Sequence, residues 1–201
     1  MTGRPTTAAG PHRYTVVGSK VVFSGRVISV RVDQVEMPGG LVAQRDIVVH
    51  PGAVGVAVVD ADDRILLIRQ YRHSVADVIW EVPAGIRDVD CEALVVTAQR
   101  ELIEEAGLRA HEWYVLCDVL SSPGMSDETY RVFLARGPVA VPDDERPALH
   151  DEEVDLDPTW VDLDEALRWV DDGTIRNAMC VIAVIGADRA RRSGYTTLRR
   201  A

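Results

Sequence analysis

The stretch from Trp80 to Leu108 reads WEVPAGIRDVDCEALVVTAQRELIEEAGL, and it decides the fold. Small or apolar residues recur in it every four positions, which predicts an amphipathic helix with one apolar stripe. These residues are Leu94, Ala98, Leu102 and Ala106. Asp90 is the expected N-cap of this helix, and Gly107 is the expected residue just past its C-terminus.

Two carboxylates are expected on one face of this helix. Glu101 and Glu105 are four residues apart, so their side chains stand one turn apart. Two like charges at this spacing repel each other, and a surface helix gains nothing from them. Mg²⁺ prefers one or two carboxylates together with water and phosphate oxygens, and it would remove the repulsion. The spacing therefore indicates a site for a hard divalent cation, with a solvated acidic helix as the alternative.

The same stretch resembles the Nudix box, which reads Gly, five residues, Glu, seven residues, then Arg-Glu-apolar-any-Glu-Glu-any-Gly-apolar. Here Gly85 opens the pattern, Glu92 is its first acid, and Arg100 to Leu108 complete it. One departure is visible, because six residues separate Gly85 from Glu92 and Cys91 occupies the standard glutamate position. The seven-residue spacing from Glu92 to Arg100 is intact, so we expect a longer loop before an unaltered helix.

Nudix enzymes hydrolyse a nucleoside diphosphate linked to another group, and the resemblance assigns roles to individual residues. Glu101 and Glu105 match the metal-binding glutamates, and Glu104 completes the cluster through a second metal or a bound water. Arg100 orients the carboxylates through forked hydrogen bonds, so Arg100 and Glu104 are also catalytic candidates. The backbone carbonyl of Ala84 is a further expected metal ligand. Mg²⁺ is the implied cofactor, with Mn²⁺ as the alternative.

Composition limits the classes of function. With 201 residues, 47% hydrophobic and 27% charged, the chain is an ordinary globular protein of one sizeable domain and a small addition. Its net charge of -10 argues against a nucleic-acid partner, because phosphate binding needs clustered Lys and Arg. The three cysteines lack CxxC spacing and predict free thiols in a reducing cytoplasm. No apolar run approaches the length of a membrane span, so no membrane partner is expected.

The chain is expected to contain four segments. Residues 1–13 have little to bury and predict a disordered tail. Residues 14–50 read as short antiparallel strands that form a domain too small to be stable alone. Pro51-Gly52 marks the boundary to a catalytic domain over residues 51–190, and residues 191–201 predict a basic, mobile tail.

Strands and helices alternate within the catalytic domain. Residues 53–60 form a near-continuous apolar run, typical of a strand buried on both faces. Further strands are expected at 65–73, 113–122 and 129–137, and two helices follow the acidic loop at 141–155. The predicted fold class is α/β, a Nudix fold with an α/β/α sandwich around a mixed sheet, together with a small N-terminal antiparallel β domain.

Several residues outside the helix are candidates for substrate binding. Arg72 ends the strand at 65–73, a usual location for substrate contacts, and a surface arginine is the alternative. Trp80 is either a core aromatic or a platform for a base, and Glu81 beside it leads into the box. Arg45 is either a ligand contact or a strand-face arginine.

From Tyr14 to about Ile185 the chain resembles bacterial ADP-ribose pyrophosphatases. Pro123 lies 15 residues after Leu108, in a position associated with ADP-ribose preference. The flanking SSPGMSDE, the QYRH strand end and the IRNAMCVIAV helix also look like that subfamily.

This resemblance implies a homodimer in which the N-terminal β segment is exchanged between subunits. Arg45 would then reach the adenine side of a ligand bound by the other subunit, and Arg72 would contact phosphate. Gly124 is a further substrate-binding candidate, and Glu128 matches an acid that hydrogen-bonds the terminal ribose.

The implied catalytic base is a glutamate on a mobile loop outside the box. The loop from His150 to Asp155 lies at the expected place in the chain. Glu153 is the first candidate and Glu152 the second, because a shift of one residue is easy in a gapped loop. A solvated acidic loop is the alternative interpretation.

Three functions are compatible with these patterns. The first is Mg²⁺-dependent hydrolysis of ADP-ribose to AMP and ribose 5-phosphate. The second is Nudix hydrolysis of another compound, such as a nucleotide sugar, a dinucleoside polyphosphate, NADH or an oxidised nucleotide. The third is a non-catalytic sensor of ADP-ribose, which the intact box glutamates and the lack of a spare DNA-binding segment disfavour.

Overall fold

The computed structural model describes residues 13–147 and 156–201, and these form two compact units. The first unit comprises the described residues up to His50 together with Ser122–Glu128. The second comprises Pro51–Ser121 and the described residues of Thr129–Ala201. Residues 1–12 of the expected tail and the loop that carries Glu152 and Glu153 lie outside the described residues.

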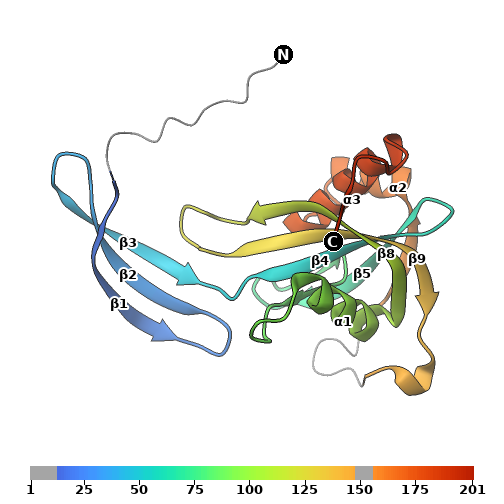
Figure 1. The fold of residues 1–201 in the computed structure, drawn as a ribbon, viewed down its shortest axis with the longest axis horizontal. Coiled ribbons are helices and arrows are strands. Elements are labelled where there is room, and N and C mark those ends of the chain that lie inside the picture. The colour runs from blue at the N-terminus through green and yellow to red at the C-terminus, as the bar shows by residue number, and fades with distance from the viewer. Residues whose placement is uncertain (1–12, 148–155) are drawn as a thin grey trace, which may run out of the picture. The chain divides into compact units, whose positions relative to one another are not determined.

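The first unit is a three-stranded antiparallel sheet in the order β1-β2-β3 (Figure 1), as the sequence predicts. Its strands are β1 (Val16–Ser24), β2 (Ser29–Glu36) and β3 (Val42–Val49). Gly39 and Gly40, at the predicted turn, have φ of 91° and 82°, a conformation that glycine adopts without strain. The Ser122–Glu128 segment joins β3 through two backbone hydrogen bonds, from Val48 N–H to Met125 O and from Asp127 N–H to Val48 O.

A polar cluster forms around Asp33 in the first unit. Asp33 is the only buried residue among the described residues of this unit. The Ser19 hydroxyl donates to its carboxylate at 2.6 Å, and Arg31 Nε donates at 3.1 Å. The Ser19 hydrogen bond and then Arg31 lower the pKa of Asp33 below its usual value. A sheet whose described residues bury one acid and no apolar side chain has no core of its own.

The second unit is built on a mixed sheet, which confirms the predicted α/β fold class. Its strands are β4 (Ala53–Val59), β5 (Arg64–Arg72), β6 (Asp77–Glu81), β7 (Ala84–Ile86), β8 (Leu108–Leu120), β9 (Thr129–Ala140), β10 (Thr159–Asp162) and β11 (Arg199–Arg200). The main path runs β10-β5-β4-β9-β8-β11, while β6 pairs with β5 and β7 pairs with β4. Strands β4 and β9 are parallel, and the other pairs are antiparallel.

Helices cover both faces of this sheet (Figure 1). Helix α1 (Leu94–Ala106) packs through Ala98 and Leu102 with one set of alternate β4 residues, Val54, Val56 and Val58. Helices α2 (Leu163–Asp171) and α3 (Ala178–Arg192) pack in a second cluster with the other set, Ala53, Ala57 and Val59. The predicted strand at 53–60 is therefore buried on both faces, because successive side chains of a strand point to opposite sides.

The predicted end of α1 is confirmed, and its predicted N-cap is wrong. Gly107 has a φ of 60° and donates its N–H to the carbonyl of Ile103, as a helix-ending glycine does. The helix begins at Leu94 after Ala93, which makes no side-chain cap, and not after Asp90. The residues before it form a turn instead, in which Cys91 has a φ of 63° and the N–H of Glu92 donates to the Val89 carbonyl.

The C-terminal residues also differ from the prediction of a mobile tail. Helix α3 continues to Arg192, and Arg199 and Arg200 then pair with β8. In the segment between α3 and these two residues, the Tyr195 hydroxyl donates a hydrogen bond to Asp63 at 2.7 Å. The guanidinium of Arg136 lies 3.8 Å from the centre of the Tyr195 ring. Pairing and stacking fix this segment on the second unit. Among the described residues, no helix is long and apolar enough to cross a membrane.

Candidate active site

Helix α1 presents Glu101 and Glu105 to the short strand β7. Glu105 Oε2 accepts the N–H of Ala84 at 2.8 Å. A Cβ at Gly85 would lie 2.1 Å from the carboxyl carbon of Glu101, so that carboxylate rests directly on the glycine backbone. Both side chains are buried, with 8% of Glu101 and 5% of Glu105 exposed. One strand edge thus receives two buried carboxylates from one helix face.

Arg100 joins the box acids to the loop that precedes α1. Its Nη1 lies 2.8 Å from Glu101 Oε1 and 3.2 Å from Glu104 Oε2. Its Nη2 lies 2.8 Å from Asp88 Oδ1 and 3.7 Å from Glu92 Oε2. Burial lowers the pKa of Arg100, but the charges of these acids, Glu101 first, outweigh burial and raise it. The guanidinium stays charged and contacts acids both of the box helix and of the loop before it.

The donor set fits a hard divalent cation that completes its shell with other ligands. In the described part of the chain, no group of three or more His, Cys, Asp or Glu side chains forms a ready metal cluster. Glu104 is directed to Arg100, so the structure does not gather all of the expected glutamates at one point. Mg²⁺ is suited to such a site, because it uses one or two carboxylates plus water and substrate phosphate oxygens. Arg100 supplies one positive charge beside Glu101, and a divalent cation would add a second beside both buried carboxylates.

Arg72 and Glu81, two of the predicted substrate-binding residues, form one ion pair. Arg72 Nε and Nη2 donate to the two carboxylate oxygens of Glu81 at 2.9 Å and 2.6 Å. Glu81 is buried, and the side-chain amide of Asn177 donates to it at 3.1 Å. Sequence reasoning missed Asn177, although an asparagine just before an apolar run is a helix N-cap signal, and Asn177 does cap α3. Arg72 is therefore oriented by a buried acid at the end of β5.

Trp80 packs against other side chains in the second unit. Its ring lies 5.2 Å from that of Trp169, and the guanidinium of Arg69 lies 5.4 Å from its ring centre. It is partly buried against the cluster beneath α2 and α3. These contacts favour the core interpretation of Trp80 over the platform interpretation.

The remaining described candidates belong to the first unit. Arg45 lies on β3, is exposed and donates to the carbonyl of Gln44 at 2.8 Å. Gly124 and Glu128 lie in the segment that joins β3, and Glu128 Oε1 is 3.7 Å from His50 Nδ1. Within this unit the structure thus attaches the predicted ADP-ribose segment to the strand that carries Arg45.

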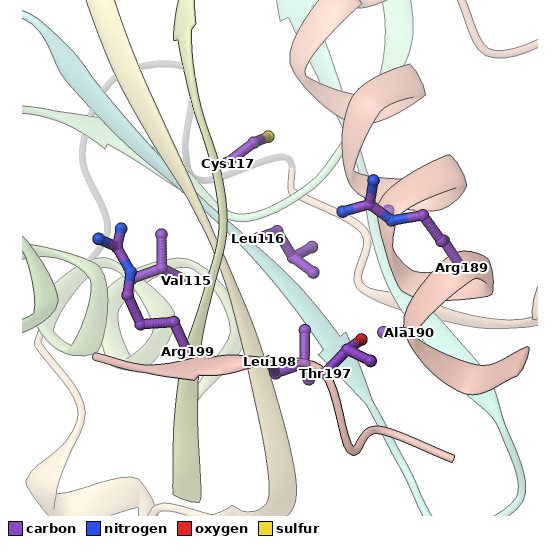
Figure 2. Close-up of a pocket in the computed structure, with 9 residues that line it drawn as sticks. Val115, Leu116, Cys117, Arg189, Ala190, Thr197, Leu198 and Arg199 are labelled. Atoms are coloured by element: carbon purple, nitrogen blue, oxygen red, sulfur yellow. The ribbon is translucent and has the colours of Figure 1, made fainter. Parts of the chain in front are cut away.

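A cavity of about 300 Å³ lies elsewhere in the second unit, between β8, α3 and residues 197–199 (Figure 2). Its walls include Leu116, Cys117, Arg189, Thr197, Leu198 and Arg199. Figure 2 shows the guanidinium groups of Arg189 and Arg199 separated by β8, so they do not converge on one point. None of the box carboxylates lines this cavity. It is therefore not the candidate active site.

Comparison with known proteins agrees with the box and the fold. A family model described as the NUDIX domain matches residues 49–180. The chain is 40% identical over 188 residues to an ADP-ribose pyrophosphatase of Mycobacterium tuberculosis, covering 94% of this chain and 89% of the relative. It is 35% identical to an ADP-ribose pyrophosphatase of Bacillus subtilis, covering 84% of this chain and 89% of the relative.

Two further matches extend the comparison. The chain is 37% identical over 168 residues to a methanol dehydrogenase activator of Bacillus methanolicus, covering 84% of this chain and 89% of the relative. A solved structure described as an ADP compounds hydrolase superposes with a TM-score of 0.73 at 20% identity, covering 92% of this chain and 97% of that one. At this identity the superposition supports the fold alone.

Proposed function

Because the chain belongs to the Nudix hydrolase family, we propose that it is an ADP-ribose pyrophosphatase that yields AMP and ribose 5-phosphate. The observation that carries the proposal is the 40% identity over 94% of the chain to the Mycobacterium tuberculosis ADP-ribose pyrophosphatase. The intact box residues Arg100, Glu101, Glu104 and Glu105 support it.

The two buried glutamates supply what the reaction needs from the protein. Pyrophosphate cleavage in water is mostly a problem of charge on the phosphate oxygens. A bound divalent cation, for which we propose Mg²⁺, neutralises that charge and lowers the pKa of a coordinated water. Glu101 and Glu105 would hold it, because Gly85 and the Ala84 N–H fix both carboxylates before metal arrives. Fixed ligands lose little entropy on binding.

Arg100, Glu104 and Ala84 have supporting roles in this proposal. Arg100 keeps Glu101 oriented through its 2.8 Å contact, and Glu104 acts through a second cation or a bound water. Glu104 is suited to that role because 30% of its side chain is exposed and can reach solvent ligands. The carbonyl of Ala84 is the proposed backbone ligand, at the strand edge that Glu105 contacts.

The substrate contacts and the assembly follow the family pattern. Arg72, oriented by Glu81, binds phosphate, and Arg45, Gly124 and Glu128 of the first unit bind the adenine and ribose parts. We propose a homodimer that exchanges the first unit, since exposed apolar side chains such as Val21 and Leu41 are 59% and 75% accessible in one chain.

Neither nucleic acid nor membrane is a proposed partner. The proposed location is the cytoplasm, which suits three free cysteines.

Glu153 is the proposed general base, with Glu152 as the second choice. The Glu153→Gln variant should lower kcat by about 10²- to 10⁴-fold, the usual contribution of a general base, with little change in ADP-ribose affinity. Steady-state kinetics and ADP-ribose titration measure the two effects separately. If Glu152→Gln is the damaging variant and Glu153→Gln is not, the base is one residue earlier.

A substrate panel tests the function itself. ADP-ribose, NADH, ADP-glucose, diadenosine polyphosphates and 8-oxo-dGTP are each incubated with Mg²⁺ or with EDTA, and products are detected with a coupled phosphatase. We expect the highest kcat/KM for ADP-ribose, no turnover with EDTA, and a loss of several orders of magnitude in Glu105→Gln with normal folding. Preference for another compound would keep the Nudix chemistry and discard the substrate. Binding of ADP-ribose without turnover of any compound would indicate a sensor.

A further inference from the structure

The guanidinium of Arg100 has two sides with different neighbours. Nη1 contacts the box glutamates, Glu101 at 2.8 Å and Glu104 at 3.2 Å. Nη2 contacts the preceding loop, where Asp88 lies at 2.8 Å and Glu92 at 3.7 Å. Only the Asp88 contact on this loop side is a hydrogen bond. The Nε atom of Arg100 is buried and makes no hydrogen bond.

Arg100 and a divalent cation compete for the same acids. Both positive charges favour the oxygens of Glu101 and Glu104, and they also repel each other. An arginine held only through Nη1 would be drawn fully onto these carboxylates and would weaken metal binding. An acid on Nη2 prevents this, because it anchors the guanidinium from the opposite side and offsets its charge.

We propose that Asp88 is a positioning residue for metal binding, acting through Arg100 on Glu101 and Glu104. The inference rests on the metal-binding role proposed above for the box glutamates. Among the described residues, the Asp88 side chain accepts a hydrogen bond from Arg100 and shares none with Glu101, Glu104 or Glu105. Its effect must therefore pass through the guanidinium.

The turn that follows β7 brings Asp88 to this place. Asp88 N–H donates to the Ile86 carbonyl at 3.1 Å, which turns the chain immediately after β7. A second turn follows, in which Cys91 has a φ of 63° and the N–H of Glu92 donates to the Val89 carbonyl. Two acids of one loop, Asp88 and Glu92, can consequently face the same guanidinium.

Asp88 is a poor candidate for a purely structural ion pair. Half of its side chain is exposed, at 51%, and exposed pairs add little to folding stability. The Asp88→Asn variant should therefore melt close to the wild type. Metal affinity is expected to fall roughly 10-fold or more, because groups that orient metal ligands commonly have effects of this size.

Asp90 provides a matched control. It lies in the same loop and is exposed, and the structure shows no ion pair between it and Arg100. Asp90→Asn removes the same charge from the same loop, so it reports any long-range electrostatic effect. Asp88→Glu keeps a carboxylate on an exposed loop and should restore most of the affinity.

The test measures Mn²⁺ binding to the full-length protein without substrate. The electron paramagnetic resonance signal of free Mn²⁺ reports how much is bound, and competition with Mg²⁺ gives the affinity for Mg²⁺. We expect weaker binding for Asp88→Asn, wild-type binding for Asp90→Asn, and no further effect of Asp88→Asn in an Arg100→Gln background. Equal affinities for Asp88→Asn, Asp90→Asn and wild type overturn the inference, and so does an equal loss in both variants. If Glu105→Gln also binds Mn²⁺ as the wild type does, the proposed metal site itself fails.

Discussion

Gly85 shows how a single residue can determine the geometry of the candidate site. Its backbone lies against the carboxylate of Glu101, and an added Cβ would approach the carboxyl oxygens to 2.3 Å and 2.5 Å. Strand β7 is hydrogen-bonded to β4, whose residues are all buried, so the strand cannot easily retreat. The glutamate side chain would have to move instead.

The Gly85→Ala variant should therefore fold normally and lose activity. Displacing a catalytic ligand by about 1 Å commonly costs about 10²-fold in rate, and we expect a loss of at least this order in kcat/KM. Turnover of ADP-ribose and thermal unfolding measure activity and stability independently. Gly18→Ala is the matched control, because its Cβ would meet the nearest atom at an ordinary 3.7 Å. Wild-type turnover by Gly85→Ala would contradict this account of the close contact.

At the scale of elements, local patterns predicted more than non-local contacts did. The four-residue repeat and Gly107 predict the box helix and its end, because both signals depend on nearby residues. The start of α1 was predicted wrongly, because the turn at Cys91 has no signature in side-chain type. Strand β11 was missed, since its two residues are fixed by pairing with β8 far away in sequence.

The same distinction applies to the candidate site. The spacing of Glu101 and Glu105 predicts a shared helix face, because helical geometry fixes which residues are neighbours. The contact of Asp88 with Arg100 and that of Asn177 with Glu81 could not be predicted in this way. They depend on how a loop turns and on which strand a helix end meets.

The C-terminal segment gives a pH-dependent prediction. Burial, and then the hydrogen bond to Asp63, raise the pKa of Tyr195 from 10.0 to about 12. Between these two values the folded protein keeps a phenol proton that the unfolded chain has lost. The contribution of Tyr195 to the free energy of unfolding is therefore fully present below pH 10, and it is lost as the pH rises toward 12.

The Tyr195→Phe variant isolates this contribution. At pH 8 it should be less stable by about 1 kcal/mol, the net value of one hydrogen bond. Its stability should decline less steeply than that of the wild type between pH 10 and pH 12. Urea unfolding at a series of pH values gives both curves. Parallel curves over this window would show that the Asp63 contact does not persist in solution.

At the scale of the whole molecule, apolar burial is divided unequally between the two units. Every buried hydrophobic residue of the described chain belongs to the second unit, while the first exposes valines on its strands. A three-stranded sheet of this kind is not expected to be stable by itself. A second copy of the chain that covers these strands would supply the missing burial, in keeping with the proposed homodimer.

Light scattering coupled to size-exclusion chromatography tests this assembly, and we expect twice the chain mass of 22.1 kDa. Val21→Asp on β1 or Val42→Asp on β3 should shift the protein to monomer, because a buried unpaired charge is costly. Val139→Asp on β9 introduces the same charge at a residue of similar exposure in the second unit, and should leave the mass unchanged. Dissociated variants should lose ADP-ribose turnover and keep Mn²⁺ binding, because Arg45 lies on the first unit and the box glutamates on the second. A wild-type protein that is monomeric yet fully active would exclude the exchanged dimer.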